Sequence, residues 1–555
     1  MIKSLTNLTG NFYFYLFLIL LAVVLRSEHE IYFPQVESDY GVQIEAAKNF
    51  VSGKGFINCL ATQPDLSKPN CEQLKLWPLG YPFLLVIGWY IFHNWIASAI
   101  SWQVLSMLLL LFGMLRLLTL MEVSRRLKCL FLLFFAFTAT PFYYWATTDM
   151  MVTAVFTWCV FIMLRIEKEQ KGKWKHFILL GILSFFNCTI RFASIPNLVI
   201  IPIFYLLIGF IRKDKMAYMG AFLIAFISFG AAFLFFSINK IDSARTSFMD
   251  NLIHLNLYWG HLRWFDSFPS HSFFYTSPLE YRLSPNHLAL IRTFRIFIHA
   301  VSISILLLLF RMFILKDKIL SKFNSPVPEE RIRFDFILLF VVASLSISGV
   351  MILQSLTTPP EGKSFGPAWM PYLWTFVYAT RYFAIPMIMI QIMFFVGLSR
   401  TDFKHQIFFS RSAGLLIIVA VSWSLLYFAY SFRQIHLAGG NGGGSFWVNQ
   451  KADLSVFHEI NALAEKEKTP IVYAGYDLAM GSAPILEFSS STLNDNYPKL
   501  LSDSLNVTDR LTLLIKFPPA AEMNLKEQQF VRVHQGYDLH SGIPEHIVRF
   551  DFNKK

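Results

Sequence analysis

Long apolar runs recur along this chain, and the first of them, NFYFYLFLILLAVVL, occupies residues 11–25. A membrane-spanning helix needs about 20 largely apolar residues, because lipid offers the backbone no hydrogen-bond partner. The chain is 55% hydrophobic and only 15% charged, whereas roughly 25% of an average soluble domain is charged. The first run is too long for a signal peptide and lacks a small-residue cleavage site. We therefore predict a polytopic α-helical membrane protein whose first helix is retained.

The apolar runs predict about 11 spans. A shorter run at 82–92, PFLLVIGWYIF, is predicted to lie at the membrane interface. Only RFAS and a proline separate the fifth and sixth spans, which predicts a tight hairpin. The predicted spans are 9–26, 95–115, 129–144, 150–165, 176–190, 195–211, 216–237, 293–315, 335–356, 383–399 and 412–430.

The net charge of +12 is unevenly distributed between the loops. The even-numbered connections together with Lys3 contain 22 Lys and Arg against 8 Asp and Glu, and the odd-numbered loops contain 11 against 13. Lys and Arg mark the cytoplasmic side, which predicts a cytoplasmic N-terminus and an outer C-terminus. The excess charge is thus a topology signal. No basic face with interleaved aromatics accompanies it, so we predict no nucleic-acid partner.

The composition changes after the last predicted span. HLAGGNGGGSF at 436–446 reads as a linker. Residues 1–435 are predicted to form the transmembrane domain, with a first outer loop at 26–94, and 447–555 a small soluble α/β domain outside the membrane. This tail is predicted to contain helices at 452–468 and 520–528 and strands at 469–477, 510–517, 530–535 and 546–552.

Two of the five cysteines, Cys59 and Cys71, share the first outer loop. An oxidising compartment would let them form a disulfide, and we favour this over two free thiols. Cys129, Cys159 and Cys188 fall in or beside predicted spans, where packing is the expected role.

The same loop contains Asp39, placed between the first span and a helical pattern. That pattern has Ile44, Ala47, Phe50 and Val51 on one face and ends at Gly53. An outer aspartate is ordinarily only solvated. Asp39, however, lies between a span and a predicted interfacial helix, where a lipid-linked substrate would present its head group.

In order along the chain come a spanning helix, an outer Asp39-Tyr40, A-x-N-F-x-x-G-x-G-F at 47–56, P-x-G-Y-P at 78–82 and an apolar helix. This arrangement resembles the GT-C class of membrane glycosyltransferases. The similar branch contains the dolichyl-phosphate-mannose protein mannosyltransferases and the lipid A aminoarabinose transferase, and many of its bacterial members carry an outer domain like the tail. The resemblance implies inverting transfer of a sugar from a polyprenyl phosphate to a hydroxyl of a lipid, glycan or protein acceptor.

Asp39 occupies the position of the family's catalytic acid, which implies that it accepts the acceptor's proton as a general base. Many relatives have Asp-Glu, whereas this chain has Tyr40, and the nearest extra acid is Glu37. A second carboxylate acting on the acceptor or on a metal is therefore not predicted. The histidines of loop 238–291 lack a metal-ligand spacing, so we predict no metal site, although a divalent cofactor stays open.

The leaving phosphate requires cations, and Arg binds phosphate through its planar fork. Arg381, in TFVYATRYFAIPMIM, resembles a family Arg-Tyr, so we assign Arg381 and Tyr382 to the donor phosphate. Arg191 ends the fifth predicted span and is a second candidate, with snorkelling to the interface as the alternative.

Further candidates for the substrate cavity each have a structural alternative. Asp149 begins the fourth span, where capping of a helix N-terminus also explains an acid. Lys363 falls on a loop where solvation is the simpler fate. The remaining candidates are Glu37, Tyr40 and Tyr81.

These observations predict a membrane glycosyltransferase, mannosyltransferase-like and located in the bacterial inner membrane, with its active site outside. Two other readings are a transporter or flippase of lipid-linked saccharides and an inactive scaffold of the same fold. A transporter is expected to have mid-span charges and broken helices. The predicted spans are nearly free of such charges, which favours the enzyme.

Overall fold

A computed structural model gives the fold of the chain, in two compact units. The helical unit comprises residues 1–28 and 103–429, and the sheet unit comprises 29–102 and 430–555. Apart from a few isolated positions, the residues that the structure describes are 12–32, 38–61, 67–74, 77–137, 148–169, 173–238, 300–316, 318–357, 383–400, 471–474, 485–488, 509–517, 531–538 and 543–552.

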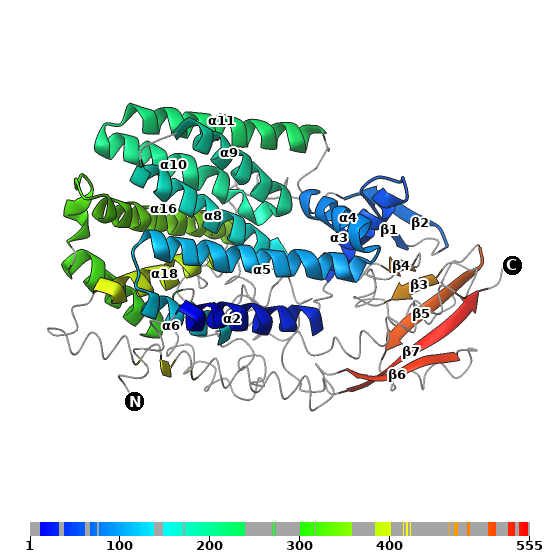
Figure 1. Cartoon of the computed structure of the whole chain (residues 1–555). Helices are drawn as coiled ribbons and strands as arrows, with labels where there is room; N and C mark the ends of the chain where they lie inside the picture. Colours follow the sequence, from blue (N-terminus) through cyan, green and yellow to red (C-terminus); the bar gives the residue numbers. More distant parts are fainter. Residues whose placement is uncertain are drawn as a thin grey trace. The chain divides into compact units, whose positions relative to one another are not determined.

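The helical unit is built from long apolar helices that run side by side (Figure 1). They form because their sequences are apolar over many turns, with charged residues gathered near the ends, as Lys213 and Asp214 are between two of them. The elements are α2 (Phe12–Tyr32), α5 (Trp95–Leu120), α6 (Arg125–Phe137), α8 (Thr148–Glu169), α9 (Lys173–Ile190), α10 (Pro196–Arg212), α11 (Lys215–Ile238), α16 (Pro328–Thr357) and α18 (Ala384–Arg400), with the π-helix η4 (Arg311–Lys316) and the 3-10 helix η5 (Ile319–Lys322).

Four described helical segments are long and apolar enough to cross a membrane: Ala97–Leu120, Thr148–Glu169, Lys215–Ser237 and Pro328–Val350. Shorter apolar helices include Phe12–Ser27, Pro196–Arg212 and Ala384–Ser399. On α11 the rings of Phe222, Phe226 and Phe233 are each at least 70% exposed, as expected of a lipid-facing surface. The predicted class, an α-helical membrane protein, is confirmed. The number of spans and their orientation stay predictions, and 412–430 falls largely outside the described residues.

The predicted tight hairpin between the fifth and sixth spans is confirmed. Helix α9 ends at Ile190, a 3-10 turn, η1, covers Phe192–Ser194, and α10 begins at Pro196. Proline is favoured at such a start because the first helical N–H has no partner to lose. The Ser194 hydroxyl lies 2.6 Å from the carbonyl oxygens of both Asn187 and Arg191 and shares its one proton between them. This contact provides a partner for the Asn187 carbonyl near the end of α9 and helps to fix where the chain leaves the helix at Arg191.

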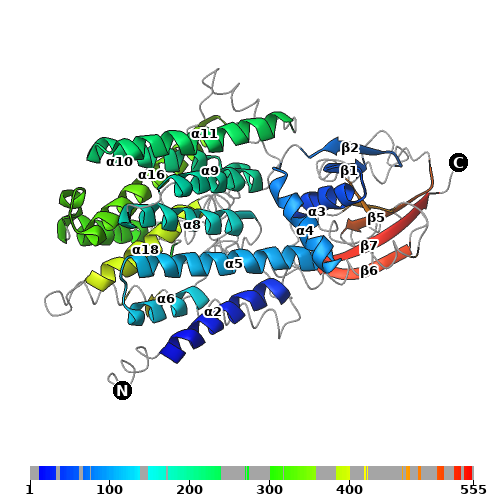
Figure 2. The ribbon, with the colours of Figure 1, turned by 45° about the horizontal axis from the view of Figure 1, so that its top comes forward.

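The sheet unit contains one seven-stranded sheet in the order β2-β1-β4-β3-β5-β7-β6. Its strands are labelled in Figure 1, and Figure 2 shows the unit from a second direction. Parallel pairs join β1 to β4, β4 to β3 and β3 to β5, whereas β1–β2, β5–β7 and β6–β7 are antiparallel. The strands are β1 (Ile57–Ala61), β2 (Pro69–Gln73), β3 (Ile471–Ala474), β4 (Ile485–Phe488), β5 (Leu511–Phe517), β6 (Val531–Asp538) and β7 (Ile543–Phe552).

Four tail strands, β3, β5, β6 and β7, coincide with the predicted ones, whereas β4 was not predicted. Apart from Lys466, the predicted tail helices lie outside the described residues. The sequence also did not predict that the first loop and the tail share a sheet. Strand β1 of the loop pairs with β4 of the tail, with Leu60 opposite Glu487 and Ala61 opposite Phe488. Residues 29–102 and the tail accordingly belong to the same compact unit.

Candidate active site

Asp39 lies in the first turn of α3 (Ser38–Val51). The sequence pattern placed the helix after Tyr40, but the structure begins it at Ser38, so the Asp39 backbone is itself helical. The first N–H groups of a helix have no intrahelical partner, and together with the macrodipole they stabilise a nearby carboxylate. The side chains of Asp39 and Tyr40, and all of Glu37, lie outside the described residues.

Helix α3 buries the face that the sequence indicated, with one exception. Ile44 and Ala47 are fully buried, as is Ala46, and the helix packs on α4 (Gly80–Phe92) and β1. Phe50, predicted for the same face, is 38% exposed. Its ring instead stacks on Phe56 with the centroids 4.2 Å apart. The turn after the helix folds Phe56 back over Phe50, which a helical period alone does not indicate.

The motif at 47–56 is the turn that ends α3. Gly53 has φ +79° and Gly55 has φ +85°, values that glycine adopts without steric cost. The N–H of Lys54 donates to Asn49 O at 2.9 Å and that of Gly53 to Phe50 O at 2.9 Å, which is the Schellman pattern of helix ends. The glycines of the motif thus have a structural reason: they turn the chain from α3 into β1.

Two polar side chains of α3 bind β1. Glu45 Oε1 accepts a hydrogen bond from the N–H of Cys59 at 2.8 Å, and Asn49 Nδ2 donates to Ile57 O at 2.8 Å. Burial raises the pKa of the Glu45 carboxyl to about 7, although the Cys59 N–H and the charge of Lys48 oppose this shift. Glu45 was not predicted as a functional residue from the sequence. The available signal was its position between the apolar residues Ile44 and Ala46, on a helix predicted to bury one face.

Strand β1 is tied to β2 by a disulfide. Cys59 and Cys71 are partners in the antiparallel register and are covalently bonded. The bond closes the excursion between the two strands, as the shared loop of the two cysteines suggested. The other three cysteines form no disulfide and are buried in the helical unit.

Helix α4 packs closely on the beginning of α5. Ser98 Oγ donates to Leu85 O at 2.8 Å, and Trp102 Nε1 donates to Leu84 O at 2.7 Å. A Cβ on Gly88 would meet Ser98 Oγ at 2.2 Å, so only glycine permits this approach. Tyr81, predicted for the substrate cavity, is 1% exposed in the first turn of α4. Its contact with a substrate stays a prediction.

In the helical unit, Arg191 and Asp149 form an ion pair. Arg191 Nη1 lies 2.6 Å from Asp149 Oδ2 and donates to Thr148 Oγ1 at 3.1 Å. The Asp149 side chain is 6% exposed and that of Arg191 15%. Both residues are at helix ends, Asp149 in the first turn of α8 and Arg191 just after α9. The positive end of α8 therefore also favours the Asp149 carboxylate, so the helix macrodipole and the ion pair act together.

The other predicted site residues, Arg381, Tyr382 and Lys363, lie outside the described residues, as do His254, His261 and His271. Within the part of the chain that the structure describes, no group of three His, Cys, Asp or Glu side chains could hold a metal ion.

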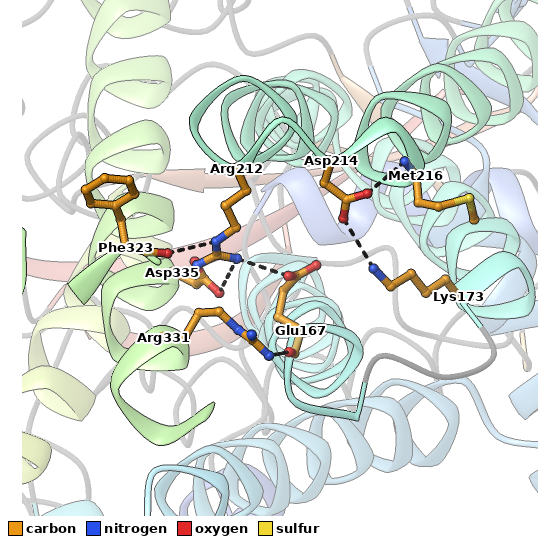
Figure 3. A network of polar contacts seen from close by, with 8 residues as sticks. All are labelled: Glu167, Lys173, Arg212, Asp214, Met216, Phe323, Arg331 and Asp335. Carbon is orange, nitrogen blue, oxygen red and sulfur yellow. Dashed lines mark hydrogen bonds and ion pairs between the residues drawn. The ribbon is translucent and has the colours of Figure 1, made fainter. Parts of the chain in front are cut away.

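A buried charge network that was not predicted from the sequence joins α8, α10 and α16 (Figure 3). It lies at the end of α8 opposite to Asp149. Arg212 at the end of α10 contacts Asp335 of α16 through two nitrogens, at 2.5 and 3.1 Å, and Glu167 of α8 at 3.1 Å. Arg212 Nε also donates to Phe323 O, and Arg331 Nη2 to Glu167 O. Glu167 and Asp335 are at most 3% exposed. Paired in this way, the charges join three helices instead of exposing a lone ion to lipid.

The structure is similar to those of known membrane transferases. The crystal structure of ArnT from Cupriavidus metallidurans bound to undecaprenyl phosphate matches with a TM-score of 0.52 and 12% identity, over 96% of this chain and 97% of that one. Its apo state matches with a TM-score of 0.50, 11% identity and the same coverage. The oligosaccharyltransferase AglB from Archaeoglobus fulgidus, in complex with an inhibitory peptide and a dolichol-phosphate, gives a TM-score of only 0.38 at 11% identity, over 90% of this chain and 69% of that one.

No protein-family model matches the sequence, and none of the curated protein sequences does. The likeness in three dimensions nevertheless extends over nearly the whole chain. The fold predicted from the order of motifs, that of the GT-C class, is confirmed at this level.

Proposed function

We propose that this chain transfers a sugar from a polyprenyl-phosphate donor to an acceptor hydroxyl at the outer face of a bacterial inner membrane. The observation that carries the proposal is the likeness to ArnT over almost the full length of both chains. That protein was crystallised with undecaprenyl phosphate, a lipid of the proposed donor's class. The presence of an acid in the first turn of α3, directly after the first apolar helix, supports the proposal independently of this likeness.

Asp39 is the proposed general base. Its carboxylate takes the proton of the acceptor hydroxyl while the acceptor oxygen attacks the anomeric carbon of the sugar. The bond from that carbon to the phosphate oxygen breaks, and its electron pair leaves with the polyprenyl phosphate. One displacement of this kind inverts the anomeric configuration. A helix N-terminus supports this role, since it favours the charged form that a base requires.

The departing phosphate is the proposed ligand of Arg191 and of Arg381 with Tyr382. Asp149 then acts as the residue that orients Arg191, because an ion pair at 2.6 Å fixes one end of its guanidinium group. Glu37, Tyr40, Tyr81 and Lys363 remain the proposed lining of the substrate cavity. The sugar–phosphate bond supplies the driving force, so the proposed reaction needs no nucleotide.

The test is sugar transfer by purified full-length protein from undecaprenyl-phosphate-linked radiolabelled sugars, compared between wild type and Asp39→Asn. We expect Asp39→Asn to lose about 10²- to 10⁴-fold in rate, the usual contribution of a general base. Glu72→Gln is the matched control, since it also converts an acid to its amide in the first loop, at an exposed position on β2. Equal rates for wild type and Asp39→Asn would eliminate the proposed base.

A second arm separates the enzyme from its alternatives. Mass spectrometry of cell-envelope glycolipids and glycoproteins after deletion of the coding sequence is expected to show the loss of one sugar unit. If the purified protein consumes no labelled donor and this profile is unchanged, the transporter or the inactive scaffold is the better reading.

A further inference from the structure

The catalytic role proposed for Asp39 requires a helix that is held in place, and the contacts of α3 show how this is done. We propose that Glu45 and Asn49 are positioning residues, which fasten the helix of Asp39 to strand β1 and through β1 to the sheet of the tail. This inference rests on the proposed function for its catalytic consequence. Its structural part is independent of that function.

Both side chains project from the same face of α3, because residues four apart lie one above the other on a helix. Glu45 receives the N–H of Cys59 at 2.8 Å, and Asn49 gives its amide proton to Ile57 O at 2.8 Å. These backbone groups belong to Ile57 and Cys59, two of the three residues of β1 that precede its pairing with β4 at Leu60. The helix therefore supplies partners for part of the strand that β4 does not cover, and the strand holds two successive turns of the helix.

Strand β1 is a rigid support because it is fixed on both sides. On one side the Cys59–Cys71 disulfide and a five-residue antiparallel register attach it to β2. On the other side Leu60 and Ala61 pair with β4, which in turn pairs in parallel with β3 of the tail. The tail thus has a function in this scheme, because its sheet supports the strand to which α3 is attached.

Asp39 is six residues before Glu45, which corresponds to about 9 Å along a helix. A small tilt of α3 about its attachment to β1 is therefore transmitted to Asp39. Because a displacement of about 1 Å in a reacting group can cost about 100-fold in rate, the attachment affects catalysis without touching the substrate. The structural alternative is that Glu45 and Asn49 merely stabilise the loop. It predicts lower stability at unchanged kcat in the molecules that remain folded.

Three variants distinguish these cases in the full-length protein. Glu45→Gln keeps an oxygen that accepts from Cys59 N–H, Glu45→Leu removes it, and Asn49→Asp removes the donor to Ile57 O with little change of shape. We expect Glu45→Leu and Asn49→Asp to lower kcat for sugar transfer about 10- to 100-fold, with KM changed less than about threefold. Glu45→Gln should stay within about threefold of wild type, and Glu72→Gln is again the matched surface control.

Hydrogen exchange of the α3 amides, residues 38–51, provides the readout that does not depend on activity. We expect faster exchange in Glu45→Leu and Asn49→Asp and wild-type exchange in Glu45→Gln. The inference is overturned if Glu45→Leu and Asn49→Asp keep wild-type kcat, or if Glu45→Gln falls as far as Glu45→Leu, which would indicate a chemical role for the carboxyl. Should Glu45→Leu not fold, Asn49→Asp decides by the same criteria. Absence of transfer by the wild type, with the predicted exchange pattern intact, would refute the proposed function alone.

A further variant tests the pairing between β1 and strand β4 of the tail. Phe488 is the last residue of β4 and pairs with Ala61 of β1, beyond the register that β4 shares with β3. Proline removes the backbone N–H and disturbs pairing in a sheet interior. Phe488→Pro is expected to speed exchange in α3, far from it in sequence, and to lower kcat. Unchanged α3 exchange in this variant would remove the tail from the scheme.

Discussion

Arg191 Nη1 lies 2.6 Å from Asp149 Oδ2, joining the end of α9 to the start of α8. The sequence indicated Arg191 as a ligand of the donor phosphate and Asp149 as part of the substrate cavity. In the structure the two side chains form an ion pair, so a phosphate bound at Arg191 would meet a guanidinium already held in place.

The pair itself can be measured. Because both side chains are largely buried, a double-mutant cycle with Asp149→Asn and Arg191→Gln should give a coupling energy of about 2 kcal/mol, measured by SDS-induced unfolding. The same cycle at Arg165 and Glu169, an exposed pair of α8, should give no more than about 0.5 kcal/mol. Equal coupling in both cycles would show that the Arg191 pair is not a fixed part of the fold.

The network around Arg212 is more deeply buried, so breaking it should cost more folding stability. Asp335 is completely buried, and its loss leaves Arg212 without its two-nitrogen partner. We expect Asp335→Asn to lower the free energy of unfolding by about 3–5 kcal/mol. Asp214→Asn is the control, since its carboxylate is 29% exposed and can be rehydrated; we expect a cost of about 1 kcal/mol. A smaller loss for Asp335→Asn than for Asp214→Asn would contradict the assigned burial.

Glu45 gives a pH dependence with a defined sign. Its pKa is raised from 4.5 to about 7, mainly by burial, so between these values the folded loop binds more protons than the unfolded one. The contribution of Glu45 to folding stability is therefore greatest below pH 4.5 and is lost as pH rises to about 7, at a slope of at most about 1.4 kcal/mol per pH unit.

The charges around Glu45 are few, which makes this test clean. Lys48 is the charged group that favours its ionised form, and neither α4 nor β1 contains Asp, Glu, Lys, Arg or His. The free energy of opening α3, from hydrogen exchange at several pH values, should lose this component in Glu45→Gln. If Glu45→Gln keeps the wild-type slope of opening free energy against pH, the group that titrates is not Glu45.

Two glycines of the first loop should respond to alanine for different reasons. At Gly53 a Cβ would meet no atom within 4 Å, so the cost of Gly53→Ala is the left-handed backbone alone, about 1–2 kcal/mol. Gly53→Asn should cost less, since asparagine tolerates this region. At Gly88 the Cβ would collide with the Ser98 side chain, so Gly88→Ala should cost about 1–3 kcal/mol. Ser98→Gly removes that side chain together with its hydrogen bond to Leu85 O, so Gly88→Ala should cost less in the Ser98→Gly background than in the wild type. Thermal unfolding of the single and double variants checks both, and an equal cost of Gly88→Ala in the two backgrounds would contradict a clash with the Ser98 side chain.

The kind of protein could be predicted from the amino-acid sequence alone. Apolar runs without charge predict membrane helices because the lipid leaves no alternative for the backbone, and the order of motifs around Asp39 indicated the GT-C fold. Local signals were also sufficient for the α9–α10 hairpin with Pro196 at its start, and for the end of α3 at Gly53. Each of these features depends on residues close together in the chain, whose chemistry can be read from the sequence.

The contacts between groups far apart in the chain were visible only in the folded structure. The attachment of Glu45 to Cys59, the pairing of Arg191 with Asp149 and the joining of Glu167, Arg212 and Asp335 connect separate elements. A single sequence shows which of these residues carry a charge, but it does not name their partners. The addition of β1 to the tail sheet joins residues that are more than 400 positions apart in the chain. It could not be predicted, because pairing between strands uses backbone groups and leaves no side-chain signature of the partner strand.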